Sequence, residues 1–430
     1  MSIHAGFAEV DITPPVGISK IGWIKDIKAD RILDPLYGRV AIFESDGETI
    51  AFVQMDTLQV RWTQTNEIRQ HVAERFGYPG DRVMVCATHN HAGPAVADAG
   101  EVQMDLHYTA QTVERIVTAF GEAQHGLATA RIGMGRCFEF GVSQNRRVIM
   151  RDGTVRTHGT FDDPEALCLG GPIDPEVAVI GARGADGRLM GCLVNFACHP
   201  THHGGDTAIS AGFPGVLAAR LKRYGCPVTL FLNGASGNIH TADPTQGGRD
   251  RTMEEVGNRL SEDVRGVLGS MTLRSDVRLD SRLKSVELPY REPTEEEVEG
   301  RVRGAQRFVD PRVYDDMIPA IVERIRERGV QPAEIQAHVI DECVLVSVPC
   351  ELFVQYGLQI KAQAHPRQAL IVGYANGQIG YVPHKEAFER GGYETTFGPS
   401  SQMGCCAGDL LTNAALELIR ETPTLDAQAE

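Results

Sequence analysis

The chain contains 430 residues, of which 42% are hydrophobic and 23% are charged, a composition typical of water-soluble globular proteins. Its 42 lysine and arginine residues stand against 57 aspartate and glutamate residues, which gives a formal net charge of −15 at pH 7. Because nucleic acids and anionic membranes bind positively charged surfaces, this balance argues against both as partners.

The N-terminal segment lacks the features of a secretion signal. Residues 1–13 contain no continuous apolar stretch and include Glu9 and Asp11. The sequence also has no run of about 18 apolar residues, the length that a membrane-spanning helix needs. We therefore expect a cytoplasmic protein without a membrane span.

Five short apolar runs, rich in β-branched and aliphatic residues, predict buried strands. The runs occupy residues 50–55, 82–88, 189–198, 228–232 and 343–348. Each run ends on a polar cluster, and three of these clusters contain histidine. Strand ends of this kind are where catalytic side chains commonly lie in α/β proteins.

Amphipathic helices are predicted between these strands. Apolar residues recur at three- and four-residue spacing over 63–76, 112–122, 214–224 and 252–268. The pattern predicts an α/β fold with a layered, mixed sheet, in which active-site loops follow the carboxyl ends of the strands. We expect the polar clusters to converge on one site there.

Residues 291–328 differ from their surroundings because they are dense in glutamate, aspartate and arginine and are interrupted by prolines. Charges of both signs at helical spacing predict a helical excursion on the surface. A lid over a substrate site is the alternative. The sequence shows no internal repeat and no low-complexity linker, so we expect residues 1–430 to form one catalytic domain that includes this excursion.

Histidine carries most of the chemical information. His89 and His91 are two residues apart, so in an extended segment both rings lie on the same side and can approach one ion or substrate. His199, His202 and His203 follow another strand. A catalytic zinc commonly takes three protein ligands from histidine, aspartate and glutamate.

His89, His199 and Glu351 fit that ligand set, since each follows a predicted strand. Ordinary hydrogen-bonded histidines are the alternative for the first two. For Glu351, the alternative is a favourable interaction with the dipole of a helix that begins there.

Residues 87–94, Ala-Thr-His-Asn-His-Ala-Gly-Pro, match the histidine motif of a known family. Further matches follow in the same order at 145–146, 197–201, 210–215, 237–239, 349–353, 381–383 and 393–399. On these motifs the chain resembles the catalytic N-terminal domain of the neutral or alkaline (non-lysosomal) ceramidases, zinc-dependent amidases that cleave the N-acyl bond of ceramide. The resemblance covers residues 6–418, essentially that whole domain.

The resemblance implies four zinc ligands, which are His89, His199, Glu351 and Tyr381. A tyrosine ligand does not follow from spacing, because a phenol ionises near neutral pH only beside a strong Lewis acid.

The resemblance also implies that His91, Arg146 and Tyr393 lie near the reacting amide. His91 would then transfer a proton, and Tyr393 and Arg146 would stabilise the tetrahedral oxyanion.

Two departures from the family stand out. His240 lies where the ceramidases have a serine, so a serine nucleophile is not implied here. This histidine could protonate the leaving nitrogen, orient the attacking water, or bind a second metal ion with His202 or His203. We favour proton transfer, which predicts hydrolysis without a covalent intermediate. The ceramidases also carry a C-terminal immunoglobulin-like domain, for which we expect no counterpart in this chain.

The sequence therefore predicts a zinc-dependent amidohydrolase that uses metal-activated water to cleave an amide C–N bond in a small, water-soluble substrate. Three alternatives stay open. These are ester or lactone hydrolysis at the same site, true ceramidase activity, and a catalytically inactive protein that binds a metal or ligand.

Overall fold

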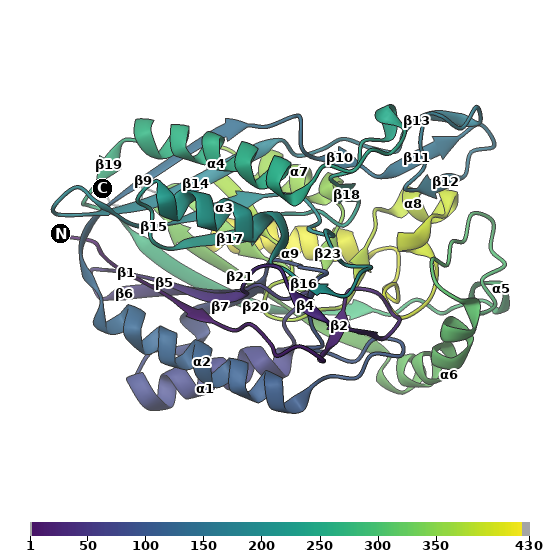
Figure 1. The fold of residues 1–430 in the computed structure, drawn as a ribbon, viewed down its shortest axis with the longest axis horizontal. Helices are drawn as coiled ribbons and strands as arrows, with labels where there is room; N and C mark the ends of the chain where they lie inside the picture. Colours follow the sequence, from purple (N-terminus) through teal and green to yellow (C-terminus); the bar gives the residue numbers. More distant parts are fainter. Residues whose placement is uncertain (1, 424–430) are drawn as a thin grey trace.

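The apolar runs of the N-terminal two thirds pair into one large mixed sheet, seen in the computed structural model, which describes residues 2–423 (Figure 1). The strand order is β17-β15-β14-β9-β1-β5-β6-β7, and β19 pairs with β9. The strands are β1 (His4–Asp11), β5 (Tyr37–Ser45), β6 (Glu48–Met55), β7 (Val83–Ala87), β9 (Ala128–Phe138), β14 (Glu176–Gly184), β15 (Leu189–Phe196), β17 (Thr229–Asn233) and β19 (Leu273–Arg274). The β6–β7 and β15–β17 pairs are parallel and the others are antiparallel, which confirms the predicted mixed sheet.

Four helices cover the outer face of this sheet. Helices α1 (Trp62–Phe76) and α2 (Leu106–His125) lie over one half, and α3 (Gly212–Arg223) and α4 (Met253–Ser270) lie over the other (Figure 1). All four match predicted amphipathic segments. Their apolar sides pack on every second residue of the strands, as the two-residue period of a strand requires.

A second sheet packs on the inner face of the first. It has the order β20-β21-β22-β24 and consists of β20 (Leu279–Pro289), β21 (Val330–Ile340), β22 (Cys343–Ser347) and β24 (Gln368–Val372). Phe43 and Phe52 of the first sheet and Leu345 and Leu370 of the second belong to the buried layer between the sheets.

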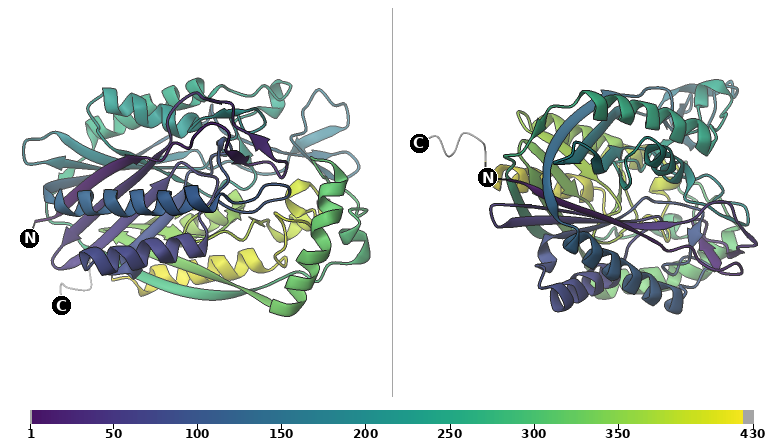
Figure 2. Two further views of the ribbon diagram at one scale, coloured as in Figure 1. Left: turned by 60° about the horizontal axis from the view of Figure 1, so that its bottom comes forward. Right: turned by 60° about the vertical axis from the view of Figure 1, so that its left-hand side comes forward.

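The outer face of the second sheet is covered by α6 (Pro311–Arg328), α7 (Val354–Gln363) and α9 (Ala407–Glu421). The layers therefore run helix, sheet, sheet, helix, and Figure 2 shows them from two further sides.

Residues 291–328 contain the short helix α5 (Glu295–Val298) and α6. Tyr314, Ile318, Ile321 and Ile325 of α6 are buried against the second sheet. This helix thus has an apolar stripe under its charged outer face.

Short strand pairs hold the loops at one end of the layers. They are β2 (Ser19–Ile21) with β3 (Ile27–Lys28) and β8 (Gly93–Pro94); β4 (Arg31–Ile32) with β16 (Ala208–Ile209); β10 (Gln144–Asn145) with β18 (Ile239–His240); β11 (Arg147–Met150) with β12 (Val155–Thr157) and β13 (Ala166–Leu169); and β23 (Glu351–Leu352) with β25 (Tyr381–Val382). The short helix α8 (Lys385–Arg390) follows β25. Among residues 2–423, none of the helices combines the length and apolarity that a membrane crossing requires.

Candidate active site

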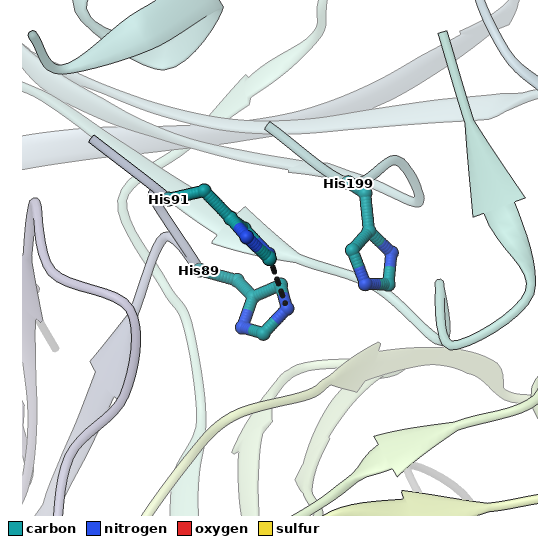
Figure 3. A group of neighbouring side chains, drawn as sticks. All are labelled: His89, His91 and His199. Atoms are coloured by element: carbon teal, nitrogen blue, oxygen red, sulfur yellow. Dashed lines mark hydrogen bonds between the residues drawn. The ribbon is translucent and has the colours of Figure 1, made fainter. Parts of the chain in front are cut away.

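His89 and His91 lie directly beyond β7 and face the same space. Their Nε2 atoms are 3.2 Å apart, an approach marked by the dashed line in Figure 3. His89 adopts a left-handed backbone with φ of 68°, which is uncommon outside glycine and often marks a functional site. The two rings thus share one space, as predicted, although the backbone at His89 is left-handed and not extended.

His199 enters the same space from the end of β15. Its ring and those of His89 and His91 form a group in which the candidate ligand atoms all lie within 4.8 Å of one another (Figure 3). His89 and His199 are almost completely buried. Two loops separated by over 100 residues thus meet at one point, which bears out the expected convergence of strand ends.

The three rings share one hydrogen-bonding pattern. Each Nδ1 lies beside a backbone carbonyl, at 2.9 Å for His89 and Leu58, 3.0 Å for His91 and Gly22, and 2.7 Å for His199 and Ser236. A carbonyl only accepts hydrogen bonds, so each Nδ1 carries the proton and donates it. In the neutral rings, every Nε2 then presents a lone pair toward the common centre.

Burial keeps two of these rings neutral. It lowers the pKa of His199 to about 3, with a further contribution from the Arg146 charge. Burial, followed by the neighbouring His89 and His199, also lowers the pKa of His91 well below its usual value.

Glu351 and Tyr381 reach the centre together, because β23 and β25 pair in parallel and place these two residues opposite each other. Glu351 Oε2 lies 3.2 Å from His199 Nε2 and 3.3 Å from His89 Nε2. Burial opposes ionisation of this carboxyl, but the two imidazoles outweigh it and hold the pKa of Glu351 well below its usual range. Burial and the Glu351 charge raise the pKa of Tyr381 well above its usual value.

These donors suit a divalent cation such as zinc. Imidazole lone pairs that face one another repel unless a proton or a cation lies between them, and burial disfavours the proton here. Nitrogen and carboxylate ligands with the second ring nitrogen fixed by a carbonyl are typical of protein zinc sites. The His89–His91–His199 group could therefore hold a metal ion, with Glu351 beside it.

Arg146 lies behind Tyr381. Its Nη2 donates to the Tyr381 hydroxyl at 3.0 Å and to the Gly237 carbonyl at 2.8 Å, and its Nε donates to Glu394 at 2.9 Å. An added Cβ at Gly237 would clash with the backbone of Glu351. Glycine at this position therefore permits the backbones of Gly237 and Glu351 to approach each other closely.

Glu394 is fully buried between two arginines, Arg146 and Arg147, and the Arg147 Nη1 donates to it at 2.6 Å. Burial alone would raise the pKa of this carboxyl, but the two guanidinium charges lower it to about 2. Glu394 therefore holds Arg146 in place as an ion pair.

A cavity of about 550 Å³ opens from the centre. His89, His91, Glu351, Tyr381 and Tyr393 contribute to its lining. Burial raises the pKa of Tyr393, so its phenol stays protonated at neutral pH and can donate a hydrogen bond. Five of the eight predicted site residues thus share this space.

The other three predicted residues, His199, Arg146 and His240, are not among the cavity-lining side chains in the described part of the chain. His199 reaches the centre from the buried side, and Arg146 acts on it through Tyr381.

His240 lies on β18 opposite Gln144. Its Nδ1 accepts a hydrogen bond from the Ala242 N–H at 2.9 Å, so the neutral ring carries its proton on Nε2, which donates to Thr201 Oγ1 at 2.6 Å. Both ring nitrogens of His240 thus have a hydrogen-bond partner. The proton transfer inferred for His240 from sequence stays a prediction.

His202 and His203 turn away from the centre. His202 Nε2 bonds to the Arg251 carbonyl at 2.7 Å, and His203 Nδ1 to Asp206 at 2.8 Å. Among residues 2–423, the one group of three or more side chains that fits a metal ion is His89, His91 and His199.

Sequence analysis missed two residues of the site. Tyr374 stacks on the His89 ring with 3.9 Å between centroids, and its hydroxyl bonds to Ser236 Oγ at 2.8 Å. Glu394 is the second. Tyr374 has φ of 56°, a strained backbone that no sequence signal shows, whereas the position of Glu394 next to Tyr393 in the 393–399 motif could have drawn attention to it.

Comparison with known proteins finds similarity in structure but none in sequence. No protein-family model matches the chain, and no curated protein matches it in sequence. Among solved structures it is similar to the neutral ceramidase from Pseudomonas aeruginosa, with a TM-score of 0.75 and 20% identity over 99% of this chain and 75% of the ceramidase. It is also similar to a ceramidase complexed with C2, with a TM-score of 0.77 and 18% identity over 100% of this chain and 77% of that one.

The chain therefore has the fold of the neutral ceramidases. This structural similarity confirms, for the fold, the family resemblance indicated by the sequence motifs. The similarity extends over nearly the whole chain.

Proposed function

We propose that the protein is a metal-dependent amidohydrolase that cleaves the C–N bond of a small amide. One observation carries this proposal: three clustered imidazoles, of which His89 and His199 are buried, and a carboxylate converge beside a cavity large enough for a substrate. The ceramidase fold supports the amide as the scissile group, because ceramidases cleave an N-acyl bond.

The ligands in this proposal are His89, His199, Glu351 and Tyr381, and the ion is zinc. Zinc bound there would supply a Lewis acid that activates water and polarises the substrate carbonyl. Arg146 donates to the Tyr381 hydroxyl and so orients that oxygen within the centre.

His91 is the proposed proton acceptor and donor. Its Nδ1 is fixed by the Gly22 carbonyl, which leaves Nε2 free to take a proton beside the centre. The protonated phenol of Tyr393 lines the cavity and can donate a hydrogen bond to the oxyanion of the tetrahedral intermediate. Arg146 contributes positive charge from behind Tyr381.

Measurement of metal and activity on the same sample tests the proposal. Purified protein should contain about one zinc ion per chain and hydrolyse members of a panel of N-acyl anilides, with activity lost on chelation and restored by zinc. A panel that includes the matched esters and lactones separates amide hydrolysis from the alternatives at the same site. Metal-loaded protein that cleaves none of the amides would refute the proposal.

A further inference from the structure

The cavity extends well beyond the metal centre, and helix α6 forms part of its wall. Met317, Ile321, Arg324 and Arg328 all line it. These positions are spaced by four, three and four residues, so they form one stripe along the helix. The stripe is apolar in its first half and cationic in its second.

The geometry of an α-helix gives the distance along α6 between the apolar and the cationic residues. At about 1.5 Å of rise per residue, Arg324 lies roughly 10 Å and Arg328 roughly 16 Å further along the helix axis than Met317. The N-terminal end of α6, away from the two arginines, is the end nearer the candidate metal centre. Phe308, just before this end, stacks on Tyr393 with 4.8 Å between ring centroids. An apolar stretch therefore separates the reacting groups from the arginines.

The two arginines lack carboxylate partners among the described residues, as does the exposed Arg326 outside the cavity, whereas five other arginines of residues 291–328 are paired. Arg291, Arg301, Arg303, Arg307 and Arg312 each form an ion pair with an aspartate or glutamate. Arg324 instead donates from Nη2 to the Gln402 side chain, and its buried Nε has no partner.

The acidic residues that line the cavity form no ion pair with these arginines among the described residues. Besides Glu351 at the centre, Asp98 is the one acidic side chain that lines the cavity in the described part of the chain. Asp98 already accepts a hydrogen bond from the Met104 N–H. A chain with a net charge of −15 thus lines its cavity with two guanidinium groups that have no carboxylate partner among the described residues, the half-buried Arg324 and the exposed Arg328.

We infer that the substrate is an amide with an apolar middle and a carboxylate or similar anion at its far end, and that Arg324 and Arg328 bind this anion. Guanidinium groups recognise carboxylates through paired hydrogen bonds. Met317 and Ile321 contact the apolar part. This inference rests on the proposed amide hydrolysis and narrows its substrate class.

Matched substrates test the inference directly. One series is the mono-p-nitroanilides of linear dicarboxylic acids, and its control series replaces the terminal carboxylate by an uncharged carboxamide of the same size. A second pair of series places the carboxylate on the amine side of the amide. We expect kcat/KM to be about 10- to 100-fold higher for carboxylates of suitable length than for their carboxamides, in at least one pair.

Variants then assign the preference to residues. Arg324→Gln and Arg328→Gln should each lower the ratio of kcat/KM for a carboxylate substrate to kcat/KM for its carboxamide by about 10-fold or more. Arg326→Gln is the matched control, because Arg326 is exposed like Arg328 and belongs to the same last turn but lies outside the cavity lining. An Arg326→Gln effect equal to that of Arg324→Gln would show a general charge or helix-dipole effect and overturn the inference.

Binding of dodecanedioate, followed by calorimetry, separates this inference from the proposed function. If amides are cleaved with no preference for carboxylates, the inference is wrong and the amidohydrolase stands. If no amide is cleaved, the proposed function fails. Dodecanedioate binding that is lost in Arg324→Gln and kept in Arg326→Gln would still establish the anion site, and absence of binding would refute it.

Discussion

Histidines at two places in the molecule look alike in sequence but differ in the partner of one ring nitrogen. At the candidate metal centre, the Nδ1 atoms of His89 and His199 donate to backbone carbonyls, so their Nε2 lone pairs face the centre. At His240 the arrangement is reversed: Nδ1 accepts from a backbone N–H, and Nε2 donates its proton to Thr201.

The difference shows how the backbone assigns a role to each ring. A carbonyl beside Nδ1 fixes the tautomer that can bind a cation through Nε2, whereas an amide N–H beside Nδ1 fixes the tautomer that cannot. Burial and the Arg146 charge contribute to lowering the pKa at both His199 and His240, so the electrostatic environment alone does not distinguish them.

The largest expected effect tests the first half of this comparison. His89→Ala and His199→Ala should lose the metal ion and reduce amide hydrolysis to the uncatalysed rate, since each removes a ligand from a preorganised set. Elemental analysis and activity on the same preparations measure both. His240→Ala is the control and should retain its metal. Full metal content in either ligand variant would rule out the assignment.

The next effect concerns the third ring of the cluster. His91→Ala should keep the metal and lower turnover by about 100- to 10,000-fold, the usual contribution of a positioned acid or base. Loss of metal in this variant would instead make His91 a ligand, an arrangement that the close approach of its Nε2 to His89 allows.

A third prediction concerns Glu394, which holds Arg146 between the two histidine sites. The carboxyl has a usual pKa of 4.5 and a folded-state pKa of about 2, so its contribution to stability is complete above pH 4.5 and is lost as the pH falls through about 2. The shift corresponds to about 3 kcal/mol. Glu394→Gln should lower the free energy of unfolding at pH 7 by a similar amount and flatten its dependence between pH 4.5 and 2, measured by urea denaturation.

A variant whose stability falls equally at pH 7 and pH 2.5 would contradict this role for Glu394. The exposed pair of Arg312 and Asp310 supplies the control, because Asp310→Asn removes a surface ion pair that solvent screens and should change stability far less than Glu394→Gln.

The smallest effect is expected at His240. Its two hydrogen bonds lead us to expect that His240→Ala retains its metal, loses about 1–2 kcal/mol of stability and slows turnover by less than about 10-fold. Thr201→Val removes the partner of the same bond and should lower stability comparably. A loss of turnover of 100-fold or more, with an altered pH profile, would establish the proton transfer that we inferred from sequence.

The sequence identified the parts of the site that follow strong, local signals. Buried strands are continuous apolar runs, so the ends of β7 and β15 and the histidines beyond them could be located directly. Strands β20 and β21 escaped notice, because each has one half-exposed stretch in which polar and apolar residues mix.

Long-range pairing explains the remaining gaps. Tyr381 has no local signal and entered only through the family resemblance, since its place opposite Glu351 depends on the β23–β25 pairing. Glu394 meets Arg146 across nearly 250 residues, a contact that one sequence does not reveal. Likewise, the lining role of α6 depends on where its apolar stripe packs.

The candidate metal centre combines residues from the first quarter of the chain with Glu351 and Tyr381 of β23 and β25, so its parts are synthesised at different times. About 260 residues separate His89 from Glu351, so at typical elongation rates of 5–20 residues per second the carboxylate emerges from the ribosome roughly 10–50 s after the first histidine pair. During that interval the nascent chain offers imidazoles without their carboxylate and phenol partners. If the centre binds the proposed ion, tight capture is therefore a late event, reached only after the last third of the polypeptide has folded against the rest.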